Sequence, residues 1–476
     1  MDFLHSFLFF FLQLFILNNC QIKIPLKYYP VYAYNNSDPS TIMNNIVFQK
    51  AYASLQIGDP QQTIEIPLDF GTNIFLIMDD SKISKNPEYF SDFKTYNYSN
   101  SKKFEDLTVD YFDIGSSYLA GYSKDAFSFN EKNIMLEFLN GFNYEDSCPG
   151  SIGMKLEEPS NSEEKLQGKN LTFFEKLKKN GLISEYHWSI YFNKKEFRKE
   201  DQAFILLGKL PHEMNSDLGY FKKNNFKDGR LKPVNSKEGN KFELDQMYLF
   251  EGSNKENIIN ESLPIIEKKY IVSLDYTLGG VLLPQTFQEY YNKIFENYIE
   301  KGICFNKITY KKSYTFYYCK NDKNSISEIK KIFPGIAMIS RDLDYNFTLE
   351  AEDLFIEENE YVFCLLQFNQ HSYEKTTLYL GKPFLKKYPF SFNYDKREIN
   401  FYNSFRGDIT SGGISVATLI FSILACAIVV SVIFFLIYKF YLSERISRKK
   451  RANELGEDEY DYTSKTDEGI INQGNN

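Results

Sequence analysis

A short motif, Asp-Phe-Gly-Thr at residues 69–72, interrupts an apolar, β-branched stretch of the chain. Apolar runs on both sides of it predict two strands joined by a tight turn that carries a carboxylate. A carboxylate between two buried strands is costly unless hydrogen bonds or a function use it. The same arrangement recurs at residues 271–284, where Asp275-Tyr-Thr stands between two apolar runs. The repetition predicts two similar lobes that meet at a shared site containing Asp69 and Asp275.

The histidines limit the chemistry that the chain can carry out. His187, His212 and His371 are far apart in the sequence and have no cysteine partners at metal-ligand spacing. We therefore expect no metal, no cofactor, and no Ser-His or Cys-His catalytic centre. Two facing carboxylates offer a different route, because like charges in contact share one proton and can act as general base and general acid.

The two ends of the chain predict a membrane protein. Residues 1–20 have the apolar core of a signal peptide. Residues 414–438 contain no charged side chain, and about 25 residues at about 1.5 Å each can cross a hydrocarbon layer of about 30 Å. A cluster of Lys and Arg follows directly, which predicts a single-pass type I protein with a luminal or extracellular body in the secretory or endolysosomal pathway or at the cell surface. The formal net charge of −8 argues against a nucleic-acid partner.

At 476 residues the chain suits two domains with additional segments. We expect a short N-terminal or pro-like segment at residues 21–45, which is either a first strand or part of a pro-segment. Two β lobes follow at 46–213 and 214–405, then a stalk at 406–413, the membrane helix at 414–438 and a disordered cytoplasmic tail at 439–476. We expect the protein to be a monomer.

An oxidising compartment permits disulfides and glycans. With Cys20 assigned to the signal peptide and Cys426 to the membrane span, Cys148, Cys304, Cys319 and Cys364 remain, and these permit three connectivities. We favour the short loop closed by Cys304 and Cys319. Five sequons add candidate glycosylation sites at Asn35, Asn97, Asn170, Asn260 and Asn346.

Three further segments carry a resemblance to the pepsin family of aspartic peptidases. Residues 53–62, Ala-Ser-Leu-Gln-Ile-Gly-Asp-Pro-Gln-Gln, resemble the Ile-Gly-Thr-Pro-Pro-Gln sequence that precedes the first catalytic Asp of that family. Residues 275–284 have the family's spacing from the second Asp to a Pro ahead of a helix, and residues 378–388 resemble its closing Leu-Gly-X-X-Phe-Leu turn. The resemblance runs from about residue 47 to residue 402. It implies an all-β, bilobal fold with a few short helices and a peptide or protein as substrate.

The resemblance also implies roles for individual residues. Asp69 and Asp275 would form the catalytic pair, and Tyr111 would be the flap tyrosine, with Tyr118 as the alternative. A Cys319–Cys364 bridge would resemble the second-lobe disulfide of the family.

The active-site loops depart from the family's Asp-Thr/Ser-Gly pattern. Phe70 replaces the first hydroxyl residue, although Gly71 and Thr72 remain. In the second loop Tyr276 and Thr277 stand where the hydroxyl residue and Gly are usual, and Leu278 follows. A β-branched residue at the Gly position predicts strain or a different turn, and Phe70 could stack on Tyr276 instead of the usual hydroxyl contact. The sequence therefore leaves two functions open: an acid endopeptidase, or an inactive relative that binds peptides or partners at the cell surface.

Overall fold

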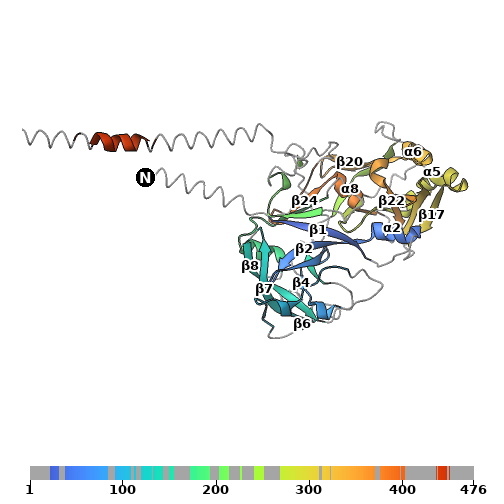
Figure 1. Ribbon diagram of the computed structural model, residues 1–476. Coiled ribbons are helices and arrows are strands. Elements are labelled where there is room, and N and C mark those ends of the chain that lie inside the picture. Colours follow the sequence, from blue (N-terminus) through green and yellow to red (C-terminus); the bar gives the residue numbers. More distant parts are fainter. Residues whose placement is uncertain are drawn as a thin grey trace, which may run out of the picture. The chain divides into compact units, whose positions relative to one another are not determined.

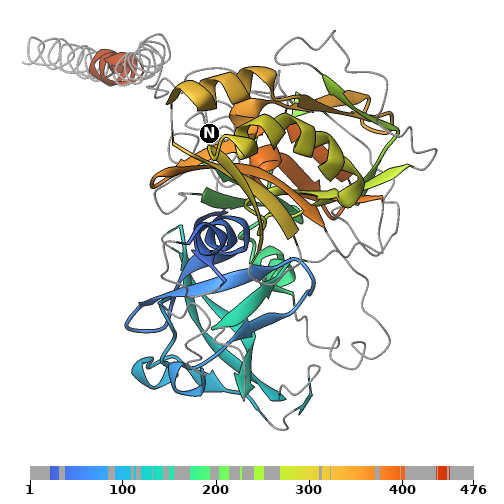
Figure 2. The ribbon, with the colours of Figure 1, turned by 90° about the vertical axis from the view of Figure 1, so that its right-hand side faces the viewer.

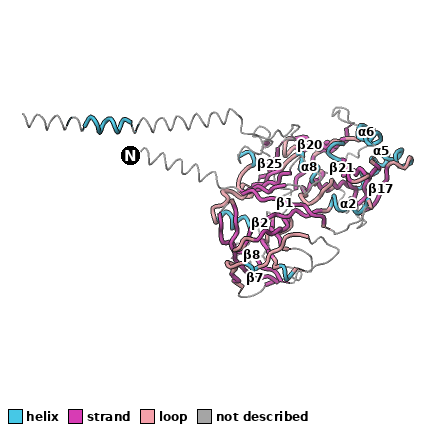
Figure 3. Tube along the Cα trace, in the orientation of Figure 1, coloured by secondary structure: helices cyan, strands magenta, loops and turns pink. Residues whose placement is uncertain are grey.

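The computed structural model describes the chain in segments. These are residues 22–31, 38–83, 92–108, 112–113, 119–130, 132–142, 149–154, 172–192, 203–213, 226–227, 241–250, 269–309, 314–321, 323–369, 376–396, 398–402, 436, 438–447 and 450. The chain divides into two compact units, residues 1–407 and 408–476. The described part of the first unit consists mostly of strands, with short helices between them (Figure 3).

The first half of this unit contains β1 Ile22–Pro30, α2 Pro39–Val47, β2 Gln49–Ile57, β3 Gln62–Asp69, β4 Phe75–Ile77, β5 Glu105–Asp106, β6 Phe112–Asp113, β7 Leu119–Phe129, β8 Lys132–Phe142, β9 Gly150–Gly153, α4 Phe173–Lys179, β10 His187–Phe192 and β11 Ala203–Leu207. Strands β2, β3, β9, β4, β8 and β7 follow one another in a single sheet, and an additional β2–β7 pairing closes them into a barrel. Alternating apolar residues of these strands fill its interior, as expected for half-buried strands.

The second half contains β12 Phe226–Lys227, β13 Lys241–Leu244, β14 Gln246–Phe250, β15 Tyr270–Leu274, β16 Val281–Pro284, α5 Gln288–Glu300, β17 Cys304–Ile308, β18 Tyr314–Lys320, α6 Lys323–Ile332, β19 Gly335–Ser340, β20 Tyr345–Leu349, α7 Ala351–Leu354, β21 Phe355–Glu358, β22 Tyr361–Asn369, β23 Thr377–Leu380, α8 Lys382–Lys387, β24 Phe390–Asn393 and β25 Glu398–Tyr402. An 8-stranded sheet has the order β13-β15-β23-β16-β22-β18-β17, with β21 paired to β22, and β14, β19 and β20 form a smaller sheet. Figure 2 shows the blue-to-teal first half and the yellow-to-orange second half as two β regions.

One sheet joins the two halves (Figure 1). Its strand order begins β12-β25-β24-β10-β11-β1-β2, so β24 and β25 from the second half pair beside β10 from the first. The N-terminal strand β1 lies between β11 and β2 within this sheet. Of the two alternatives for residues 21–45, the structure thus has a strand at residues 22–30, followed after a gap by α2.

Local interactions define both ends of α4. The Thr172 side chain accepts the N–H of Glu175 at 3.3 Å, which makes Thr172 the N-cap. Gly181 adopts a φ of 67° just after the helix, a conformation that favours glycine and stops the helix.

The second unit is described only at residues 436, 438–447 and 450. Residues 438–447 are helical, and the Ser447 hydroxyl donates to the carbonyl of Ser443 at 2.8 Å. Of the predicted disordered tail at residues 439–476, residues 439–447 belong to this helix, and apart from residue 450 the rest lies outside the described residues. No helix among the described residues is both long and apolar enough to span a bilayer. The predicted signal peptide, and all of the predicted membrane segment except 436 and 438, lie outside them.

Candidate active site

The strands around Asp69 and Asp275 repeat the same topology. The strand β3, which ends at Asp69, runs parallel to β9, and the next strand β4 is antiparallel to β9 and parallel to β8. The strand β15, which ends just before Asp275, runs parallel to β23, and the next strand β16 is antiparallel to β23 and parallel to β22. The sequence repeat therefore corresponds to a structural repeat that presents a carboxylate twice.

Close backbone contacts fix each repeat at a glycine. The N–H of Gly153 donates to the carbonyl of Ile74 at 2.7 Å, and the N–H of Gly381 donates to the carbonyl of Gly280 at 3.1 Å. A Cβ at Gly153 would lie 2.2 Å from the Asn73 backbone, and one at Gly381 would lie 2.1 Å from the carbonyl oxygen of Leu278. Only glycine permits this approach of the β9 and β23 ends to the two acidic loops.

Each carboxylate accepts hydrogen bonds from its own loop. The Asp69 Oδ1 accepts the N–H of Gly71 at 2.8 Å, and the Asp275 Oδ1 accepts the N–H of Thr277 at the same distance. The Thr277 hydroxyl adds a second bond to the Asp275 Oδ1 at 2.6 Å. Thr277 is not among the described residues with positive φ, so of the two expectations for this position, strain or a different turn, the first does not hold. A β-branched residue fits because the contact needs only its amide.

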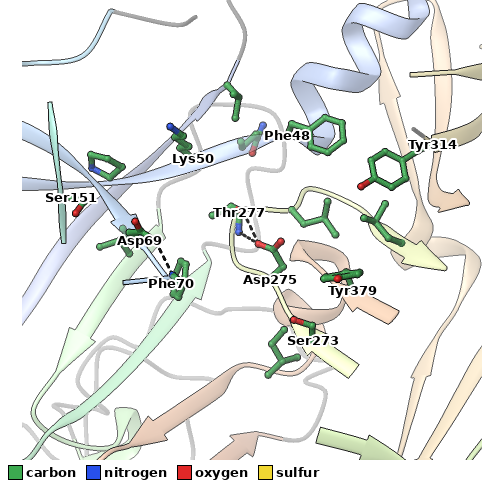
Figure 4. Close-up of a pocket in the computed structure, with 18 of the residues that line it drawn as sticks. Phe48, Lys50, Asp69, Phe70, Ser151, Ser273, Asp275, Thr277, Tyr314 and Tyr379 are labelled. Carbon is green, nitrogen blue, oxygen red and sulfur yellow. Dashed lines mark hydrogen bonds between the residues drawn. The ribbon is translucent and has the colours of Figure 1, made fainter. Parts of the chain in front are cut away.

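The two carboxylates line one cavity of about 670 Å³. Asp69 and Asp275 come from the two repeats, and both are partly exposed in the cavity (Figure 4). No hydrogen bond joins the two carboxylates in the described part of the chain. The structure thus brings the two predicted carboxylates to a common concave site, which is the default position for a binding or catalytic centre.

Aromatic rings connect the two acidic loops. The rings of Phe70 and Tyr276 stack with centroids 5.4 Å apart and planes 20° apart, which confirms the predicted contact. Trp188 contacts both rings, at 5.8 Å and 5.5 Å, and stacks on Phe392 at 4.3 Å. We call Phe70, Tyr276, Trp188 and Phe392 the aromatic cluster. It joins the two loops through apolar and quadrupolar contacts, each worth about 0.5–1.5 kcal/mol beyond burial, where the resemblance implied a hydroxyl contact.

The aromatic cluster includes the hydroxyl of Tyr276, which is buried and has no hydrogen-bond partner among the described residues. Tyr276 is 1% exposed, and burial raises the pKa of its hydroxyl well above the ordinary value, with a smaller contribution from Tyr394. Sequence reasoning missed Trp188 and Phe392, because neither lies near an acidic motif in the chain. The only available signal was that Trp188 is the single Trp.

The junction of α2 and β2 forms backbone hydrogen bonds with the loop that follows Asp275. The N–H of Gln49 donates to the carbonyl of Thr277 at 3.1 Å, and the N–H of Gly279 donates to the carbonyl of Val47 at 2.7 Å. A bridge pairs Phe48 with Leu278 between these two bonds. The apolar side of α2 packs on the second-half sheet, through Ile42, Met43 and Val47. The N-terminal part of the chain therefore contributes directly to the position of Asp275.

Tyr314 is a cavity residue that the sequence did not reveal. It lies across the cavity from Lys50 in Figure 4, and its ring contacts Phe48 at a centroid distance of 5.7 Å. Burial raises the pKa of its hydroxyl, and the negative charge of Asp275 raises it further. The Tyr314 hydroxyl therefore remains a protonated hydrogen-bond donor near Asp275.

Several predicted site residues lie outside the described residues. These are Tyr111, Tyr118, Cys148, Asn35, Asn170 and Asn260. The Asn97 side chain accepts the N–H of Ser99 as a helix cap, and Asn346 is exposed on β20. Thr72 lies beside the cavity residue Gly71, and its buried hydroxyl has no hydrogen-bond partner in the described part of the chain.

The cysteines follow the favoured connectivity. A disulfide joins Cys304 to Cys319, which pair across β17 and β18. The prediction is confirmed, and the alternative Cys319–Cys364 bridge is wrong because Cys364 is a buried free thiol. Burial raises the pKa of this thiol to about 12, so it remains protonated and unreactive. Within the described segments, no group of three or more His, Cys, Asp or Glu side chains could hold a metal ion.

A comparison with known protein families finds a similarity that covers the loop of Asp69. Residues 50–225 match the family described as eukaryotic aspartyl protease. No curated protein matches the chain. The matched residues contain Asp69 and end before Asp275, whose place in the site depends on the repeated strand topology. Residues 50–225, which include the first acidic loop, are therefore similar to the eukaryotic aspartyl protease family.

Proposed function

We propose that the protein is an aspartic endopeptidase that cleaves peptide bonds at acidic pH with Asp69, Asp275 and a water molecule. The observation that carries the proposal is the matched pair of carboxylates on one cavity. Each accepts the amide two residues further along at 2.8 Å, and the two lie at equivalent strand ends, Asp69 as the last residue of β3 and Asp275 directly after β15. The family match at residues 50–225 supports the same chemistry for the loop of Asp69.

In the proposed reaction the two carboxylates hold a single proton between them, as aspartic protease pairs do. The ionised carboxylate takes a proton from water, and the resulting hydroxide equivalent attacks the scissile carbonyl carbon. The protonated carboxyl group donates its proton to the carbonyl oxygen, which gives a neutral gem-diol. Proton transfer to the leaving nitrogen then allows the C–N bond to break. The amides of Gly71 and Thr277 hold one oxygen of each carboxylate and leave the other available.

The bilobal pepsin-like architecture belongs to this proposal. The barrel, the 8-stranded sheet and the joining sheet support it, because they place the two repeats on either side of one cavity. The altered second and third loop positions do not remove the carboxylate contacts. The aromatic cluster supplies the connection between the loops that catalysis requires, since a displacement of about 1 Å can reduce a rate about a hundredfold.

The test uses the full-length chain and a pool of unmodified peptides between about pH 3 and 6. We expect cleavage at discrete bonds, with loss of cleavage in Asp69→Asn and in Asp275→Asn. Asp344→Asn provides a matched control, because Asp344 is exposed on a turn away from the cavity. If the unaltered chain leaves every peptide intact across this range, the endopeptidase proposal fails. Binding of peptides without cleavage would then support the inactive, peptide-binding alternative.

We further propose that residues 414–438 anchor the body to a membrane as a type I protein. The support is the absence of charge over these residues and the Lys and Arg cluster that follows them. We expect the full-length chain to remain with membranes after alkaline extraction, and a chain ending at residue 407 to be released. Release of the full-length chain by the same treatment would contradict the anchor.

A further inference from the structure

Lys50 gives the cavity a positive charge. Among the described residues that line the cavity it is the only one with a cationic side chain, alongside the two carboxylates. No hydrogen bond or ion pair joins its ammonium group to another described residue. A partly exposed ammonium group on the wall of a cavity is available to a ligand.

Lys50 lies on the same side of the cavity as Asp69. The β2–β3 ladder ends at the pair Tyr52–Pro67, and Lys50 and Asp69 each lie two residues beyond that pair on their own strands. Because side chains alternate along a strand, Lys50 lies on the same face of β2 as Tyr52, and Asp69 on the same face of β3 as Pro67. Figure 4 shows Lys50 and Asp69 on one side of the cavity and Asp275 on the other. Lys50 therefore lies on the Asp69 side of the peptide path.

The Asp275 side of the cavity has a different character. Leu278 and Leu282 are 4% and 7% exposed and belong to the apolar cluster beneath α2. Phe48 and Tyr314 form an aromatic pair above them, and Tyr379 completes the wall. This wall suits an aliphatic or aromatic side chain, which would displace water from apolar surface.

We propose that the cavity selects peptides carrying an acidic side chain that binds Lys50, with an apolar side chain of the same peptide against the Leu278–Tyr314 wall. This inference rests on the proposed function, and it names the substrate class. The carboxylate of the peptide supplies a partner that no described residue gives to Lys50, and a charge-assisted hydrogen bond is stronger than a neutral one.

The experiment compares matched peptides that differ only by Glu or Gln at one position, scanned on both sides of a central Leu-Phe pair. For the full-length chain at about pH 5.5 we expect one position at which Glu raises kcat/KM about tenfold over Gln, equivalent to about 1.4 kcal/mol. We expect the preference to be abolished in Lys50→Met and replaced by a preference for Lys in Lys50→Glu. It should also weaken as the pH falls through about 4.3, the ordinary pKa of Glu.

Lys132→Glu is the matched control, because Lys132 is exposed at the β7–β8 hairpin and does not line the cavity. The same peptides, labelled and bound to Asp69→Asn, give affinities that do not depend on turnover. If the ratio of kcat/KM for the Glu peptide to kcat/KM for the Gln peptide is the same in the unaltered chain and in Lys50→Met, the inference is overturned while the endopeptidase proposal remains intact. Absence of any cleavage would refute the endopeptidase proposal, and the binding ratios would then decide the Lys50 inference on their own.

Discussion

The ring of Phe70 stacks on the ring of Tyr276, and this contact joins the loop of Asp69 to the loop of Asp275. Both residues directly follow the acidic side chains in the sequence. Trp188 from β10 packs against both rings, so the strand that joins the two halves of the protein also supports the connection. Ring packing thus takes the place of a hydrogen bond between loops. Because close packing depends on shape, the connection should be more sensitive to loss of a ring than to loss of a hydroxyl group.

Tyr276→Ala should destabilise the protein by about 3 kcal/mol or more, because it removes a fully buried ring from the aromatic cluster. Tyr276→Phe should leave the free energy of unfolding unchanged or slightly higher, because no described residue forms a hydrogen bond with the buried hydroxyl. Denaturant unfolding of both variants measures the difference. A large loss in Tyr276→Phe would mean that the hydroxyl makes a stabilising bond and would refute this account.

Gly279→Ala should disrupt the joint between the α2–β2 junction and the second acidic loop. A Cβ at residue 279 would lie 1.8 Å from the carbonyl oxygen of Ile46, so the backbone must move there. We expect kcat to fall about a hundredfold because Asp275 moves with its loop. KM should change little in comparison.

Gly302→Ala is the control for this prediction. Gly302 adopts a φ of 65°, and no atom lies within 4 Å of the point that a Cβ would occupy, so the substitution costs only backbone strain of about 1 kcal/mol. Its kcat should remain close to that of the unaltered chain. Similar kcat values in Gly279→Ala and the unaltered chain would show that the joint does not position Asp275.

His187 predicts a loss of stability in acid. Burial lowers the pKa of His187 from 6.5 to about 4; a backbone hydrogen bond with Lys209 partly offsets this, and Lys396 and His212 lower the pKa slightly further. In the unfolded chain, His187 becomes protonated as the pH falls below about 6.5, whereas in the folded chain it stays neutral until the pH reaches about 4. The stability therefore falls as the pH drops through this window and then levels off, by about 3 kcal/mol in total.

His187→Gln should flatten this part of the pH dependence, although the lost contact with Ser391 lowers stability at every pH. The measurement is the free energy of unfolding of both chains at several values between pH 4 and 6.5. An unchanged slope in the variant would mean that other groups cause the acid sensitivity.

Reduction of the Cys304–Cys319 disulfide should destabilise the second half of the protein by about 3 kcal/mol, the value expected for a loop of about 15 residues. Thermal unfolding of Cys304→Ser/Cys319→Ser compared with the unaltered chain measures this effect. Cys364→Ser is the control for cysteine substitution. A reducing agent should lower its melting temperature by the same amount as that of the unaltered chain, because Cys364 forms no disulfide. Equal melting temperatures with and without the disulfide would contradict the prediction.

The sequence alone determined the elements of the site that depend on local pattern. The apolar runs around Asp69 and Asp275 specify strands and turns, and the repetition of the pattern specifies a repeated topology, because hydrophobic alternation and turn residues act over a few positions. The short separation of Cys304 and Cys319 also favoured their pairing before the structure placed them on adjacent strands.

Tertiary structure decided the contacts between residues that are distant in the sequence. Trp188 and Phe392 join Phe70 and Tyr276 only because β10 and β24 pair in the joining sheet, and Gln49 reaches Thr277 only because α2 packs on the second half. It also decided that Thr277 can replace a glycine, since the backbone there avoids positive φ. Local pattern cannot encode such contacts, because they follow from how separate strands pack in three dimensions.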